Sequence, residues 1–423
     1  MSMSDTHSMS HLLLVLAALL ASTKLLGALA QRVGQPAVLG ELIAGVILGG
    51  SVLGLLDPSD PVIRTLSELG VIVLLFEIGL QTELGSMAKV AGTATIVALV
   101  GVVLPLTLGY AVVTGLLGLD RIPALVCGAA LTATSVGISA RVLSDLEQLS
   151  SREGQVVLGA AVIDDIVGLI VLSVVSGIVV GGGWTVGGVA VTTAIAVGFV
   201  AVAITAGGFL ARPIFKTLDT VRSPGTLGVV ALAFAFVVSA LAASSGSAMI
   251  LGAFAAGLIL NATPGRFEIE RVATTIGYFL VPIFFASVGA AVQLSAFTDM
   301  RTLTIAVLLI VAGVIGKFAA AYAPVTFRGN KKLIGVAMIP RGEVGLIFAQ
   351  MGLATQAITP SLYSAITLMV LVTTFLTPPL LTRVAPRRRE QAAVDDSGID
   401  NLVSGDWRHT PRRVSKDGGP GSV

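Results

Sequence analysis

The chain has 423 residues, of which 55% are hydrophobic and 12% are charged, and a net charge of +2 gives no indication of nucleic-acid binding. Soluble domains carry about 25% charged residues, so the composition excludes an ordinary soluble protein and predicts an all-α polytopic membrane protein. Cys127 is the single cysteine and the three histidines lie near the chain ends, which excludes a disulfide framework, a thiolate metal site and a histidine centre within the membrane.

Apolar windows of about 17–25 residues mark candidate transmembrane helices. We identify thirteen, at residues 11–30, 36–56, 64–82, 90–117, 122–144, 155–181, 187–211, 226–243, 247–262, 273–294, 302–325, 332–354 and 359–382. The first resembles a signal peptide, because Ala28-Leu29-Ala30 resembles a cleavage site. However, no Lys or Arg precedes it and Lys24 interrupts it, so we expect a retained first helix.

The loops between these spans alternate in charge. Twelve basic residues lie in one set of loops: Arg32, Lys89, Arg141, Arg152, Arg212, Lys216, Arg222, Arg266, Arg271, Arg328, Lys331 and Lys332. The other set carries Arg64, Arg121 and Arg301. The positive-inside rule then predicts an external N-terminus and a cytoplasmic C-terminus, which requires an odd number of helices. Residues 383–423 are polar and predict a disordered cytoplasmic tail without a nucleotide-binding pattern.

Two adjacent aspartates stand in the middle of the sixth span. Asp164 and Asp165 each have apolar or small residues on both sides, and a carboxylate at bilayer depth costs at least about 2.5 kcal/mol. Such groups face a protein interior or a water-filled cavity and mark ion or proton pathways. Neighbouring helical positions point about 100° apart, so one can face a cavity while the other meets a partner. Lys317, in the eleventh span, is the conspicuous buried cation.

The fifth and twelfth spans are interrupted. Residues 132–137 read TATSVG, and residues 340–343 read PRGE, with a helix-breaking proline. Irregular backbone at membrane depth is tolerated where it is buried or lines a cavity. If spans 1–6 and 8–13 are inverted repeats, each break lies in the fifth helix of its repeat, which is typical of a transporter's binding site.

The sequence resembles the monovalent cation/proton antiporter superfamily, and within it the bacterial two-aspartate sodium/proton antiporters of the NapA type. The resemblance extends over about residues 11–382. It rests on GELIAGVILG at 40–49, LLFEIGLQTEL at 74–84, TATSVGISARVL at 132–143, AAVIDDIVGLIVL at 160–172, PIFFASVGAAV at 282–292, GKFAAA at 316–321 and IPRGEVGLIFA at 339–349.

The resemblance implies a transmembrane antiporter domain at residues 1–382. It implies core helices at about 90–181 and 302–382, dimerisation helices at about 11–82 and 226–294, and a linker helix at about 187–211. It also implies a homodimer in the plasma (inner) membrane that acts in pH homeostasis. No cofactor and no enzymatic activity are expected, because the ions are transported substrates.

The same resemblance implies roles for the membrane charges. Asp165 binds the cation or protons, and Asp164 pairs with Lys317 when no sodium is bound. Sodium is a hard cation that oxygen atoms suit, so Thr132, Thr134 and Ser135 are candidate ligands beside the two carboxylates. Arg341 and Glu343 are expected to form a structural charge network around the second break. We place Glu41 and Glu77 either at polar interface positions close to helix ends or near a cytoplasmic funnel, and expect Lys24 to extend towards the cytoplasmic face.

These features predict a sodium/proton antiporter with alternating access, which accepts Na⁺ or Li⁺. If Lys317 also releases a proton, two protons exchange for one sodium ion and the exchange is electrogenic. The alternative is a potassium/proton antiporter, although that branch usually has a glutamine before the aspartate. A sodium-coupled organic solute symporter lacks an indicated substrate pocket. An intramembrane aspartyl protease needs aspartates on different helices, and a passive channel would not require the Asp/Asp/Lys set.

Overall fold

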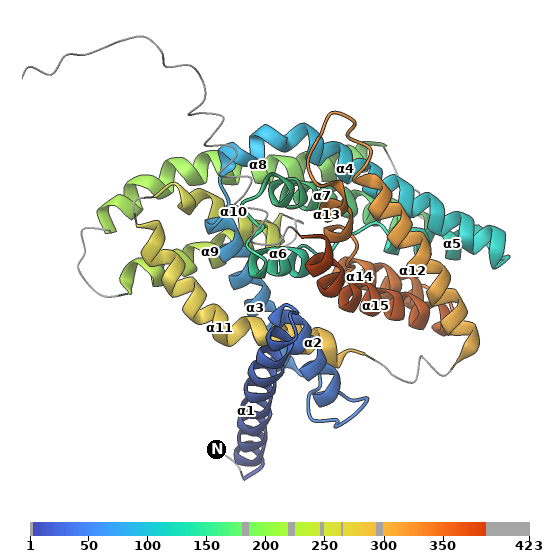
Figure 1. Cartoon of the computed structure of the whole chain (residues 1–423), viewed down its shortest axis with the longest axis horizontal. Helices are drawn as coiled ribbons and strands as arrows, with labels where there is room; N and C mark the ends of the chain where they lie inside the picture. The colour runs from blue at the N-terminus through green and yellow to red at the C-terminus, as the bar shows by residue number, and fades with distance from the viewer. Residues whose placement is uncertain are drawn as a thin grey trace, which may run out of the picture. The chain divides into compact units, whose positions relative to one another are not determined.

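The computed structural model describes residues 3–179, 186–218, 225–245, 249–263, 265–292 and 299–385, and nearly all of them are helical (Figure 1). The helices are α1 (Met3–Arg32), α2 (Ala37–Leu48), α3 (Pro61–Leu80), α4 (Leu84–Ala111) continued by the π-helical turn η1 (Val112–Leu116), α5 (Arg121–Ala130), α6 (Val136–Asp145), α7 (Arg152–Val179), α8 (Val186–Leu218), α9 (Thr226–Ser244), α10 (Met249–Asn261), α11 (Arg266–Ala290), α12 (Met300–Ala320), α13 (Lys331–Ala337), α14 (Glu343–Ala354) and α15 (Pro360–Val384).

Each predicted span overlaps one helix or, for the fifth and twelfth spans, a pair of short helices. Both interruptions lie where the sequence predicts them, between α5 and α6 and between α13 and α14. Among the described residues, seven helices are long and apolar enough to cross a membrane: α1, α4, α7, α9, α11, α12 and α15. The count of thirteen spans and the inverted repeats stay predictions. The predicted tail lies, from residue 386 onwards, outside the described residues.

Several helix boundaries differ from the prediction, and two of these differences have a local cause in the sequence. The predicted helix 36–56 is too long, because α2 ends at Leu48. Gly49 and Gly50 follow, and Gly54 has a φ of 64°, a left-handed conformation that a helix cannot contain. The third helix starts earlier than residue 64, because the Asp60 side chain accepts hydrogen bonds from the amides of Val62 and Ile63 and caps α3.

The helices pack into two groups. The core group consists of α4–α7 and α12–α15, and the flank group consists of α1–α3 and α9–α11. Within each group the helices pack along much of their length, as α4 does on α7 and α3 on α10 and α11. Between the groups the contacts are sparse and are made mainly by α6 with α2 and α3. Figure 1 shows α12, α14 and α15 on one side of α6 and α9–α11 on the other. The assignment of these groups as core and dimerisation domains stays a prediction.

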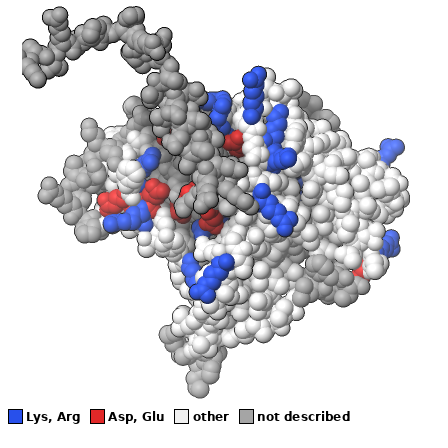
Figure 2. All heavy atoms as spheres, in the orientation of Figure 1, with Lys and Arg blue, Asp and Glu red and all other residues white. Residues whose placement is uncertain are grey.

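The exterior of the described helices is apolar. Large hydrophobic side chains such as Leu14, Val103 and Phe209 are more than half exposed. Figure 2 shows uncharged atoms over most of the described surface in this view, with the basic and acidic side chains gathered over part of it. An exterior of this kind fits contact with lipid, in agreement with the composition.

Glycines hold the flank group together by backbone contact. A Cβ atom at Gly45 of α2 would overlap the carbonyl oxygen of Ala286 in α11, and one at Gly289 would overlap the carbonyl oxygen of Leu42. Glycine at helix interfaces lets backbones approach closely, as in other membrane helices. No side chain separates α2 from α11 at this point, so even a methyl group must push the helices apart.

We therefore expect Gly45→Ala to destabilise the protein by about 1–3 kcal/mol, the usual cost of overpacking. Gly92→Ala is the matched control, because a Cβ there meets no atom within 4 Å. Alanine raises helix stability by about 0.5–1 kcal/mol over glycine at such a position. Thermal unfolding of the purified proteins in detergent measures both. A Gly45→Ala protein as stable as Gly92→Ala would contradict the close contact.

Candidate functional site

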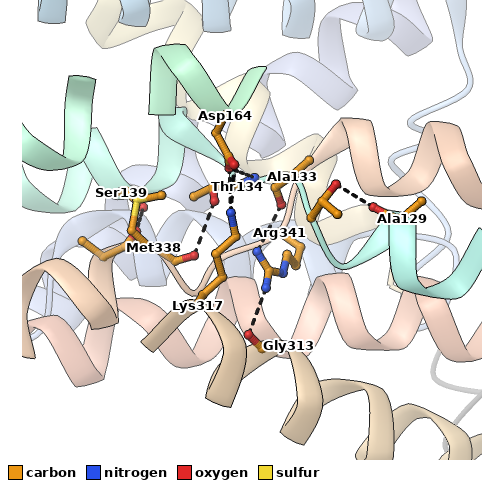
Figure 3. A network of polar contacts seen from close by, with 11 residues as sticks. Ala129, Ala133, Thr134, Ser139, Asp164, Gly313, Lys317, Met338 and Arg341 are labelled. Carbon is orange, nitrogen blue, oxygen red and sulfur yellow. Dashed lines mark hydrogen bonds and ion pairs between the residues drawn. The ribbon is translucent and has the colours of Figure 1, made fainter. Parts of the chain in front are cut away.

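The two helix breaks cross and are hydrogen-bonded to each other. The Ser135 amide donates to the carbonyl oxygen of Pro340 at 2.8 Å. The Ser139 hydroxyl donates to the carbonyl oxygen of Ala337. The Thr134 hydroxyl lies 3.5 Å from the carbonyl oxygen of Met338 (Figure 3). Backbone groups that leave the helices at the breaks therefore find partners in the opposite break, as a membrane interior requires.

Asp164 forms a buried ion pair beside this crossing. The Lys317 Nζ atom lies 2.8 Å and 3.0 Å from the two carboxylate oxygens, and both side chains have no exposed surface. The Thr134 amide, just before the start of α6, donates to the same carboxylate at 3.0 Å. Figure 3 shows Asp164 of α7, Thr134 of the first helix break and Lys317 of α12 converging. The pair joins α7 to α12 within the core group.

Asp165 faces a different environment. Asp165 is 5% exposed and lines a cavity of about 120 Å³. One wall of that cavity comes from both helix breaks, including Ser135 and Gly342. The opposite wall comes from the flank group, including Val71 of α3 and Phe284 of α11. The two adjacent aspartates thus point in different directions, as their helical spacing predicts: one lies inside the core group and the other lies between the groups.

The three predicted oxygen ligands are not equivalent. Thr134 and Ser135 line the Asp165 cavity. Thr132 is fully buried, is not among the residues that line that cavity, and its hydroxyl donates to the carbonyl oxygen of Ala129 at 2.8 Å. A cation beside Asp165 can therefore reach oxygen atoms of Thr134 and Ser135 more directly than that of Thr132.

Arg341 ties the second break to its surroundings. Its guanidinium is buried and donates to the carbonyl oxygens of Ala133 at 3.3 Å and Gly313 at 3.0 Å (Figure 3). Backbone carbonyl groups thus accept the hydrogen bonds that this guanidinium donates within the described part of the structure. The side chain of Glu343 lies outside the described part of the structure, so the predicted network of Arg341 with Glu343 stays a prediction.

Sequence reasoning missed two threonines of α15. The Thr373 hydroxyl accepts from the Arg341 amide at 3.3 Å, and the Thr374 hydroxyl donates to the Arg341 carbonyl oxygen at 3.0 Å. Both side chains are fully buried. In the sequence, the two threonines are adjacent within an apolar helix, and this pattern could have indicated a polar partner for the second break. They supply partners for backbone groups that the proline at position 340 leaves outside a helix.

Gly342 permits the close approach of the two breaks. A Cβ atom at this position would lie 3.0 Å from the Cβ and the Oγ of Ser135, which is tighter than ordinary van der Waals contact. The glycine of the PRGE motif therefore keeps Ser135 at the edge of the cavity, beside Asp165.

Comparison with known proteins identifies a family and several relatives. The family of transmembrane sodium/hydrogen exchangers matches residues 15–385. The high-affinity Na⁺/H⁺ antiporter NhaS3 of Synechocystis sp. is 40% identical, over 90% of this chain and 91% of the relative. The Na⁺/H⁺-K⁺ antiporter GerN of Bacillus cereus is 35% identical, over 86% of this chain and 94% of the relative.

A solved structure has the same fold. The sodium proton antiporter MjNhaP1 from Methanocaldococcus jannaschii superposes with a TM-score of 0.64 at 17% identity, and the match covers 88% of this chain and 97% of that chain. The likeness supports the helical architecture described above.

The Asp164–Lys317 pair gives a prediction about stability. Removing one partner of a buried pair leaves the other charge uncompensated and costs about 3–5 kcal/mol. We expect Lys317→Ala and Asp164→Asn each to lower the unfolding temperature strongly, and the double variant to lose less than the sum of both. Lys89→Ala, at an exposed position of α4, is the control and should change little. Additive losses in the double variant would contradict the pairing.

Proposed function

Since this chain belongs to the sodium/hydrogen exchanger family, we propose that it exchanges Na⁺ or Li⁺ for protons at a site centred on Asp165. Membership makes the chain a multi-pass monovalent cation/proton antiporter and not an enzyme. The cations are transported substrates and not resident cofactors. The observation that carries the proposed site is the position of Asp165, in a cavity between two helix groups and next to a buried ion pair.

Exchange requires a site that holds either the cation or protons. The Asp165 carboxylate can do this, because it binds a proton covalently or a hard cation through its oxygens, together with those of Thr134 and Ser135. We infer that sodium displaces the proton of Asp165 and draws Asp164 away from Lys317. Two adjacent carboxylates titrate as a coupled pair, so the proton release belongs to the pair.

Lys317 supplies the second proton in this scheme. When protons occupy the site, Asp165 is neutral and the Asp164–Lys317 pair has no net charge. When sodium occupies the site, both carboxylates are charged and a neutral Lys317 leaves the site with one net negative charge. Two protons therefore exchange for one sodium ion, and one charge crosses the membrane in each cycle.

Alternating access is proposed to arise from movement of the core group against the flank group. The sparse contacts between the groups support this proposal, and so does the cavity that lies between them. Asp165, which lines the cavity at their interface, can then be exposed to either side of the membrane. The homodimer through the flank group, the inner-membrane location and the orientation with a cytoplasmic C-terminus are parts of the same proposal and rest on the resemblance and the loop charges.

Potassium is the second candidate cation. The name of the Bacillus cereus relative includes K⁺ beside Na⁺. Reconstitution into proteoliposomes with an imposed pH gradient, and addition of Na⁺, Li⁺ and K⁺ in turn, decides between them. Proton flux with K⁺ but not with Na⁺ or Li⁺ would replace the sodium proposal by the potassium one.

The same assay tests the site. We expect Asp165→Asn to abolish cation-driven proton flux while the protein still folds and inserts. The asparagine amide has nearly the shape of the carboxylate, but it carries no charge and binds no proton at the pH of the assay. Asp120→Asn, at the exposed start of α5, is the matched control and should transport normally. Near-normal exchange by Asp165→Asn would show that the site lies elsewhere.

Voltage tests the role of Lys317. One net charge per cycle adds about 2.3 kcal/mol of driving force per 100 mV. At fixed ion gradients, flux of the unaltered protein should respond to a voltage set with potassium and valinomycin. If Lys317→Ala retains transport, its flux should be electroneutral and should not respond. A voltage response equal to that of the unaltered protein would contradict proton carriage by Lys317.

A further inference from the structure

A second set of charges lies at the other end of α6, away from the helix break. The Arg141 Nε atom lies 3.3 Å from the Asp145 carboxylate, one turn further along α6. Two carboxylates of the flank group, Glu41 of α2 and Glu77 of α3, lie within electrostatic range of the Arg141 guanidinium. The Arg141 side chain is 22% exposed and Glu41 is 2% exposed. A basic side chain of the core group therefore lies near two acidic side chains of the flank group across the boundary, without a direct ion pair to either in the described part of the structure.

Asp145 also bridges this boundary. The backbone amide of Ala37, in the first turn of α2, donates to the Asp145 carboxylate. The residue before α2 is Pro36, which supplies no side-chain cap. The first amides of a helix need acceptors and carry a partial positive charge, so Asp145 caps α2 from a helix of the core group.

The other charged and polar groups around Arg141 belong to the flank group. Glu77 accepts a hydrogen bond from the Thr274 hydroxyl at 2.6 Å, and Glu270 accepts one from Gln81 at 3.0 Å. Lys24 lies 5.4 Å from the centre of the Tyr278 ring. Arg141 and Asp145 are thus the core-group members of the cluster, and both lie on the helix that makes most of the contacts between the groups. We name Arg141, Asp145, Glu41 and Glu77 the Arg141 cluster.

The cluster and the Asp165 cavity lie towards opposite ends of the group boundary. On α11, Val288 lines the cavity near the end of the helix, whereas Thr274 lies at the cluster near its start. Fourteen helical positions separate them, which corresponds to about 21 Å. Leu158 of α7 is buried on the cluster side of Asp165, where it lines a small cavity of about 10 Å³ together with Asp165, Leu75 and Phe254. Side chains therefore leave only this small space between the groups at that position.

We propose that the Arg141 cluster is an electrostatic clasp that holds the two helix groups together at this end, and that it must open for the Asp165 site to be reached from there. The proposal rests on the alternating access proposed above. Movement of α6 away from the flank group takes Arg141 further from Glu41 and Glu77 and removes the Asp145 cap from α2. Arg141 and its partners then set how often this end is open, although none of them lines the Asp165 cavity.

The test measures access to Leu158. A Leu158→Cys reporter in a Cys127→Ala background is placed in lipid nanodiscs, so that a cationic methanethiosulfonate reagent reaches both faces. With the clasp intact, the reporter should react slowly. Arg141→Gln should raise the rate roughly tenfold, the ratio that about 1.4 kcal/mol of shifted equilibrium gives. Arg141→Lys, which keeps the charge, should restore most of the protection.

Matched controls separate the clasp from general loosening. Arg152→Gln removes an exposed charge at the start of α7 and should leave the reporter protected. A Ser150→Cys reporter, exposed between α6 and α7, should react equally in every variant. If Arg141→Gln fails to fold, Glu77→Gln weakens the clasp from the flank side and should raise the rate as well. Two results would overturn the proposal. In the first, the reporter is labelled no faster in Arg141→Gln or Glu77→Gln than in the protein without these changes. In the second, Arg152→Gln raises the labelling rate as much as they do.

Labelling of the reporter requires no transport, so its result can contradict the clasp without contradicting the proposed exchange, and the reverse. If Asp165→Asn retained exchange but Arg141→Gln exposed the reporter, the proposed ion site would be wrong and the clasp would stand. If Asp165→Asn abolished exchange while the reporter stayed protected in Arg141→Gln and in Glu77→Gln, the clasp would be wrong and the site would stand.

Discussion

The buried pair of Asp164 and Lys317 is the constraint on which the rest of the site depends. Two charges without exposed surface are tolerable only if they neutralise each other and if their remaining hydrogen-bonding capacity is met. The broken helices meet part of that need, because a helix that continued past Ala130 would not present the Thr134 amide to Asp164. The irregular backbone then needs partners of its own, which the opposite break and the buried threonines of α15 provide.

Two neighbouring residues thus have different roles: Asp164 contributes to stability, and Asp165 is the proposed site of binding. Asp164 is committed to contacts inside the core group, whereas Asp165 lines the cavity shared with the flank group. The carboxylate of the proposed ion site, Asp165, is therefore carried by a helix that the Asp164–Lys317 pair fixes in position. A flexible site loses affinity because its ligands must be ordered on binding, whereas the helix breaks and the ion pair already hold the groups of the proposed site in place.

The sequence predicted much of this architecture because charges and prolines are costly within a membrane. Asp164, Asp165, Lys317 and the two breaks are conspicuous for that reason, and the structure brings them together. Other features have no such signal. Thr132 looked equivalent to Thr134, and only the path of the chain at the break shows that its hydroxyl returns to its own helix. The early end of α2 depends on glycine conformation, which apolar periodicity does not record.

The glycine contacts between α2 and α11 also have a mechanical consequence. Helices separated by side chains can slide slightly, because rotamers change at little cost. Backbones that touch at Gly45 and Gly289 have no such layer, so this part of the flank group responds to load as one stiff body. In the proposed exchange cycle, strain from ion binding would therefore act mainly at the boundary with α6 and little within this part of the flank group. A stiff flank group would then concentrate the proposed movement in the core group, so that the core group shifts as a unit.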